Sequence, residues 1–171
     1  MSTNSSFPPL IQELGRRWKA PIGQVSFWVY LTVAVIGVGA IGIWVEVSRA
    51  VDASKFDAKG LITAIYTYFP AIAAGSALQL MMDASKEEHK FLRSFCVGST
   101  AIVILFTLPF FRGSSNLTLL WFCGVCGVIY SLWLWWITNG CSESFLDIDP
   151  TDSLGASPDA DLSGDTGGYN L

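Results

Sequence analysis

The chain has 171 residues, of which 51% are hydrophobic and only 14% are charged, and its formal net charge at pH 7 is −4. This composition excludes a nucleic-acid-binding surface, because no basic face can be assembled and the last 29 residues hold seven acidic residues but no lysine or arginine. The charges also leave four long uncharged runs, which is unusual for a soluble domain of this size.

These runs predict membrane-spanning helices. Crossing a hydrocarbon layer of about 30 Å takes about 20 apolar residues, and each run is long enough or nearly so. We therefore expect an all-α membrane protein whose four transmembrane helices form a bundle. An interfacial amphipathic segment precedes the bundle, and a disordered acidic tail follows it. The expected ranges are 1–23 for the amphipathic segment, 24–139 for the bundle (spans 24–47, 60–82, 92–111 and 117–138) and 140–171 for the tail.

The first element in chain order is the sequence FPPLIQELGRRWKAP over 7–21. As a helix it separates apolar from polar side chains: Leu10, Ile11, Leu14 and Trp18 on one face, with Gln12, Glu13, Arg16 and Lys19 opposite. Such a helix is typical of a segment lying in the membrane–water interface. An ordinary linker beside the membrane remains an alternative.

Small residues mark the faces on which the expected spans should pack. In the first span, Gly39, Gly42, Glu46 and Arg49 share a face, which predicts contact with the bundle and a Glu46–Arg49 pair at its outer end. The second span carries one stripe of Tyr68, Ala71, Gly75, Gln79 and Asp83, and the fourth carries Gly124, Gly127, Ser131 and Trp135. We expect the five glycines (Gly39, Gly42, Gly75, Gly124 and Gly127) to serve helix packing or homo-oligomerisation.

Tryptophans gather near the end of the fourth span, in the sequence SLWLWWITNG over 131–140. Trp133, Trp135 and Trp136 are expected to anchor the helix at the membrane interface, together with Trp18 and Trp121. An aromatic cage is disfavoured, because consecutive helical residues diverge by about 100°. The pair Asn139-Gly140 predicts a helix end with a left-handed backbone.

The only cysteine motif is Cys123-Gly124-Val125-Cys126, inside the fourth span. A four-span bundle of this length with CxxC near one end of its last helix resembles the vitamin K epoxide reductase and disulfide-forming DsbB group. That resemblance implies a thiol–quinone oxidoreductase using Cys123 and Cys126. The loop 46–59 holds no cysteine to pass electrons to a partner, so we favour a packing role for both thiols.

The tail combines acidic residues with two short apolar anchors, Phe145-Leu146 and Tyr169-Leu171, which we expect to contact a soluble cytoplasmic partner. A tail without any ligand is the alternative. The DADLSGD sequence at 159–165 resembles the start of a calcium loop but lacks the final glutamate. His89 follows Glu87 and Glu88, but a metal site there would need ligands from elsewhere in the chain. No metal or cofactor is therefore expected.

Lysine and arginine counts predict the orientation. With both termini in the cytoplasm, six fall inside (Arg16, Arg17, Lys19, Lys86, Lys90 and Arg93) and four outside (Arg49, Lys55, Lys59 and Arg112). The membrane would be a bacterial inner membrane or another plasma membrane.

No HExxH, GxSxG or phosphate-loop sequence occurs, so an enzyme is not the favoured class. We expect a non-enzymatic integral membrane subunit that assembles through small-residue faces and presents its tail and the 83–93 hairpin to a soluble partner. It would act as a scaffold, as a sensor that recruits an effector, or as a toxin-immunity protein. The alternatives are an oligomeric pore or transporter and the thiol–quinone oxidoreductase.

Overall fold

The computed structural model describes residues 7–52, 58–83, 90–142 and 145, and every regular element among them is helical. In chain order these elements are α1 (Phe7–Lys19), the 3₁₀ turn η1 (Ala20–Gly23), α2 (Val25–Tyr30), the π-helical η2 (Leu31–Gly39), α3 (Ile41–Asp52), α4 (Ala58–Asp83), α5 (Lys90–Phe111) and α6 (Leu117–Asn139). The expected tail, apart from its first residues, and the tip of the 83–93 hairpin lie outside the described residues.

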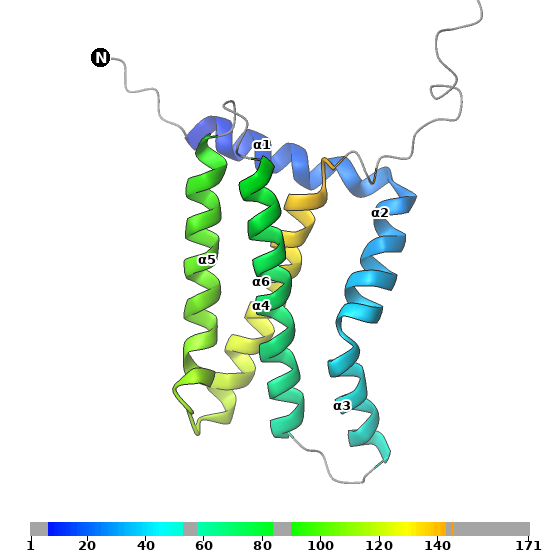
Figure 1. Ribbon diagram of the computed structural model, residues 1–171, viewed down its shortest axis with the longest axis vertical. Coiled ribbons are helices and arrows are strands. Elements are labelled where there is room, and N and C mark those ends of the chain that lie inside the picture. The colour runs from blue at the N-terminus through cyan, green and yellow to red at the C-terminus, as the bar shows by residue number, and fades with distance from the viewer. Residues whose placement is uncertain (1–6, 53–57, 84–89, 143–144, 146–171) are drawn as a thin grey trace, which may run out of the picture.

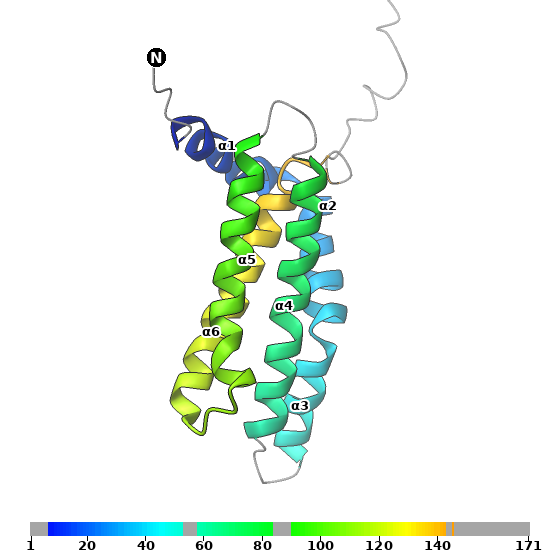
Figure 2. The same cartoon turned by 60° about the vertical axis from the view of Figure 1, so that its left-hand side comes forward.

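The segment α2–η2–α3 and the helices α4, α5 and α6 run side by side, and α1 crosses one end of them (Figure 1, Figure 2). We call each of these four a rod, and the broken segment α2–η2–α3 is the first rod. The segments 10–23 and 25–39 meet at 91°, so α1 turns sharply away from the first rod. The C-terminal end of α6 lies at the same end of the molecule as α1 (Figure 1). We call this the terminal end.

Among the described residues, three helices are long and apolar enough to cross a membrane, namely 58–82, 92–111 and 117–139. The number rises to four if the bent pair 10–23 and 25–39 is counted as one span. The described part of the chain thus confirms the expected all-helical class and contains three to four apolar candidate spans, where four were expected. The second, third and fourth expected spans agree with α4, α5 and α6 to within a few residues.

The expected first span, 24–47, was predicted as one helix, and the structure breaks it at Ala40. Residues Leu31–Gly39 form a π-helix, and Ala40 has φ −88° and ψ 17° between that segment and α3. Two side chains donate to carbonyls beside the break: the Trp44 indole Nε1 to Ile36 at 2.8 Å, and the Tyr68 hydroxyl to Val35 at 3.1 Å. The sequence pattern missed the break because apolar periodicity does not report how the backbone is hydrogen-bonded.

The main core lies among α4, α5 and α6. Phe69 is fully buried, Leu134 is 1% exposed, and both belong to one cluster with Ile62, Tyr66 and Val103. The helices α4, α5 and α6 therefore form the packed half of the molecule.

The α6 helix begins at an asparagine cap, because Asn116 Oδ1 accepts a hydrogen bond from the Leu119 amide at 3.1 Å.

The first rod joins this half near the terminal end through a smaller cluster. Phe27, Leu31 and Val35 pack with Trp135 of α6. The Phe27 and Trp135 ring centroids are 5.3 Å apart. This contact holds the α2 end of the first rod against α6, whereas α3 at its other end lies beside α4.

Candidate functional site

A buried arginine docks α1 onto the end of α6. Arg17 is only 5% exposed; its Nε donates to Glu13 Oε1 at 2.8 Å and its Nη1 donates to the Thr138 carbonyl at 3.5 Å. Carbonyls in the last turn of a helix lack intrahelical donors and carry partial negative charge, so a cation is favourable there. Arg17 therefore forms an ion pair with the Glu13 carboxylate and donates a hydrogen bond to a carbonyl at the end of α6.

The Glu13 carboxylate serves two arginines at once. Arg16 approaches it with Nε at 2.9 Å and Nη2 at 2.7 Å, in addition to the Arg17 contact. The Arg16 hydrogen bonds, opposed in part by desolvation and aided by Arg17, lower the pKa of Glu13 from 4.5 to about 2. The stability from these pairs is therefore present above pH 4.5 and is lost as the pH falls toward 2.

Further polar groups extend this contact toward α4. Gln79 Nε2 donates to Asn139 Oδ1 at 3.2 Å, and Asn139 Nδ2 donates to the Trp135 carbonyl at 2.9 Å. The Thr138 hydroxyl contacts the Leu134 carbonyl at 2.9 Å and the Ser76 carbonyl at 3.4 Å. We call Glu13, Arg17, Gln79, Thr138 and Asn139 the terminal polar cluster.

Sequence reasoning named Gln79 and missed the buried roles of Arg17, Thr138 and Asn139. Arg17 was counted only as one of the cytoplasmic cations, because a helical face pattern does not show which neighbouring element covers a charge. The side chain of Asp83, also expected near this end, lies outside the described residues.

Gly140 allows α1 to approach α6 closely. A Cβ at this position would collide with the carbonyl oxygen of Arg17. The predicted left-handed helix end is wrong, because Gly140 has φ −62° and ψ −21°, in the right-handed region. The glycine is thus required by the neighbouring backbone and not by its own conformation.

The tryptophans near the end of α6 point in different directions. Trp136 Nε1 donates to the Trp18 carbonyl at 3.0 Å, and the two rings lie 5.3 Å apart. Trp135 is only 9% exposed and packs on Phe27 and Tyr30, so it follows the packing stripe expected in the fourth span and does not face lipid as the expected anchor would. Trp135 is covered because the first rod folds back over it.

Two more expected anchors, Trp133 and Trp121, are half-buried and pack against the core. Trp133 lies 6.0 Å from Phe95 and 5.7 Å from Tyr130, measured between ring centroids. Trp121 packs against the main core cluster. A membrane-anchoring role for Trp18, Trp121, Trp133 and Trp136 stays a prediction.

Phe145, which was expected to contact a partner, packs against aromatic rings of the same chain. Its ring lies 5.9 Å from Phe27, 5.0 Å from Tyr30 and 6.3 Å from Trp135. The Phe145 ring therefore lies beside the first rod, and its expected contact with a partner stays a prediction. Leu146, Tyr169 and Leu171, the remaining expected partner contacts, lie outside the described residues.

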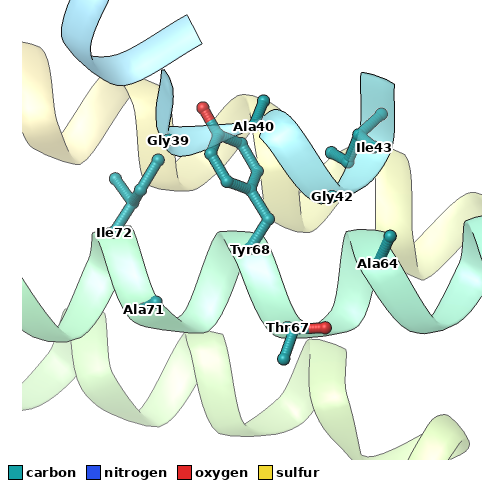
Figure 3. A pocket seen from close by; sticks show the side chains of 9 residues that line it. All are labelled: Gly39, Ala40, Gly42, Ile43, Ala64, Thr67, Tyr68, Ala71 and Ile72. Carbon is teal, nitrogen blue, oxygen red and sulfur yellow. The ribbon is translucent and has the colours of Figure 1, made fainter. Parts of the chain in front are cut away.

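A groove lies between the first rod and α4. It consists of two adjoining cavities of about 440 and 320 Å³ that share Gly39, Ala71 and Ile72 in their walls. In Figure 3 the Tyr68 ring rises from α4 toward the Gly39–Ala40 break, with Ala64, Thr67 and Ala71 along the same helix. We call this the lateral groove.

The five glycines expected at packing faces fall into two groups. A Cβ at Gly124 would lie 3.0 Å from Ile65, and one at Gly127 would lie 2.8 Å from the Phe69 ring, so both sit in tight contact with α4. A Cβ at Gly42 would meet only Ala64, at 4.0 Å, and one at Gly75 would meet no atom within 4 Å. Gly39 is intermediate, since a Cβ there would lie 3.2 Å from the Ala34 carbonyl and 3.6 Å from Tyr68.

The polar pair expected at the far end of the first rod is present. Arg49 Nη1 lies 2.9 Å from Glu46 Oε1, and the Arg49 side chain is 71% exposed. An exposed pair of this kind contributes little to stability. It marks the end of the apolar part of the rod.

The CxxC thiols are both free and half-buried. Cys123 packs against the main core cluster, to which Tyr66 belongs. Among the described residues no group of three or more His, Cys, Asp or Glu side chains could hold a metal ion. This geometry is compatible with packing and offers no ligand set in that part of the chain.

Comparison with known proteins adds no family: no family model, curated protein or solved structure matches the chain.

Proposed function

We propose that this protein is a non-enzymatic integral membrane subunit with four spans, of which α2–η2–α3 is the first. Apolar outer faces carry this proposal: Val33 is 59% exposed, Ile104 54% and Phe122 65%, each on a different rod. Soluble monomers rarely expose large contiguous apolar patches. A lipid environment would cover these faces on all sides of the bundle.

The lateral groove is the assembly surface in this proposal. In lipid, helices associate through close packing of small residues, because the hydrocarbon is as apolar as the side chains. Gly42, Ala71 and Gly75 line the groove without filling it. A transmembrane helix of a second copy or of another subunit would fill it.

The terminal end is the side that a soluble partner would meet. The lysine and arginine count supports a cytoplasmic location for this end, with the spans in a bacterial inner membrane or another plasma membrane. The seven acidic residues after Ser142 would attract a basic partner surface and make the association sensitive to salt.

Co-purification tests this proposal. The full chain, a deletion of 144–171, and a full-length control with the seven tail acids changed to Asn or Gln are purified in mild detergent from the native host. We expect a soluble protein to co-elute with the full chain, to be lost on deletion, and to be weakened by neutralisation or by added salt. Retention of the partner by the deletion variant would contradict a role for the tail and direct attention to the 83–93 hairpin.

A pore or transporter is the second candidate, favoured by one observation: a helix broken within a predicted span lies beside a cavity, an arrangement that transporters use for binding sites. The Val35 and Ile36 carbonyls beside the break already accept hydrogen bonds from Tyr68 and Trp44. This supports a structural role for the break. Solute flux into proteoliposomes, measured for wild type and Tyr68→Phe, separates the two candidates.

A further inference from the structure

Docking of α1 leaves one of its apolar sides uncovered. Leu10 packs against the cluster of Leu80, Leu92 and Cys96, and Arg17 is buried. Leu10 and Arg17 therefore mark the side of α1 that faces the bundle. Ile11 is 67% exposed and Trp18 is 45% exposed. At about 100° per residue both lie roughly a quarter-turn away from the bundle-facing side. Ile22, in the following turn, is 55% exposed.

The outer side of α1 is cationic. Arg16 and Lys19 are exposed, and Glu13 is the single acidic residue of the helix against three cations, which leaves two net positive charges. The Glu13 contacts hold Arg16 in a fixed position on the helix. An exposed apolar side beside a cationic side is the arrangement that binds anionic membrane surfaces.

The direction of α1 gives these sides a common partner. Because the helix turns by 91° at the start of the first rod, it lies parallel to the plane of any membrane that the rods cross. Its apolar side then borders the edge of the hydrocarbon, and its cations lie at the depth of the lipid phosphates.

We propose that α1 is a binding surface for anionic phospholipids of the leaflet at the terminal end. Ile11, Trp18 and Ile22 contact the acyl–headgroup boundary, while Arg16 and Lys19 bind the phosphates. This inference rests on the proposed membrane insertion. The burial of Arg17 fixes the rotation of α1 and therefore sets which side meets lipid.

The test counts retained lipids by native mass spectrometry. The full-length protein, first shown to resist alkaline carbonate extraction so that failed insertion is recognised separately, is purified in detergent with equal phosphatidylglycerol and phosphatidylcholine. Each cation near an anionic surface contributes about a fivefold change in affinity, so Lys19→Gln should lower phosphatidylglycerol retention about fivefold and Arg16→Gln/Lys19→Gln at least about tenfold. Lys19→Gln leaves the Glu13 ion pairs intact.

The matched control removes two cations at the opposite end, Arg49→Gln/Arg112→Gln, and should retain phosphatidylglycerol like the wild type. Excess inorganic phosphate at constant ionic strength should displace none of it. Equal retention of the two lipids by the wild type, equal losses in the two double variants, or displacement by free phosphate would each overturn the proposal.

Discussion

Glycines line helix faces both in the α4–α5–α6 half and along the first rod, but the helices pack tightly at these glycines only in the α4–α5–α6 half. In the packed half, Gly124 and Gly127 lie directly against side chains of α4, and the space of a Cβ is already occupied. Along the first rod and the facing side of α4, Gly42 and Gly75 border the lateral groove, where that space is empty or nearly so. A glycine stripe therefore predicts where helices can approach closely, and the bulk of the opposing side chains decides whether they do.

The largest loss of stability should come from adding a side chain where α6 packs tightly against α4. We expect Gly127→Leu to destabilise the fold by about 3 kcal/mol, the upper range for overpacking a core, because the new side chain would overlap the Phe69 ring. Gly98→Leu is the control, since a Cβ there meets no atom within 4 Å. Thermal unfolding in detergent measures both, and equal losses would mean that α4 and α6 are not in tight contact.

The second effect concerns the docking of α1. We expect Arg17→Met to cost about 2 kcal/mol, because the variant loses charge-assisted hydrogen bonds to Glu13 and to the end of α6. Arg16→Met should cost less than about 1 kcal/mol, since that side chain is 61% exposed. Limited proteolysis should cleave the Arg17→Met variant within α1 faster than the wild type. Similar rates in both arginine variants would argue against a buried Arg17.

The third effect tests the break in the first rod. Tyr68→Phe removes the hydrogen bond to the Val35 carbonyl and should cost about 1 kcal/mol. Tyr30→Phe, at a position that is 47% exposed, should change stability by less than about 0.5 kcal/mol. Hydrogen exchange should rise locally over 35–40 in the Tyr68 variant. Unchanged exchange there would mean that Tyr68 does not hold the rod.

The smallest effect on stability should come from the lateral groove. We expect Gly42→Leu and Gly75→Leu to alter the stability of a single copy by less than about 0.5 kcal/mol, because the groove has room for the added side chains. Both should nevertheless reduce association with a second helix, read as a smaller mass by light scattering in detergent. A wild-type mass in both variants would mean that the lateral groove is exposed to lipid and does not contact a second helix.

Helical periodicity and charge spacing predicted most of the architecture. The positions of α4, α5 and α6, the amphipathic α1 and the Glu46–Arg49 pair all follow from patterns within one helix. The buried Arg17, the inward Trp135 and the packed Phe145 depend on contacts between segments more than 100 residues apart. Such contacts leave no mark in the sequence of either segment. The sequence patterns therefore assign Arg17 to the cytoplasmic cations, Trp135 both to a packing stripe and to the membrane anchors, and Phe145 to a partner surface.

Membrane topology is the most direct test of the account. Single cysteines at Ser5, Ser115 and Ser153, in a chain without its native thiols, are exposed in intact cells to a membrane-impermeant thiol reagent. Four spans with both termini in the cytoplasm predict immediate labelling at position 115 and labelling at positions 5 and 153 only after permeabilisation. Labelling of just one of the two terminal positions from outside would require an odd number of spans and would contradict the account.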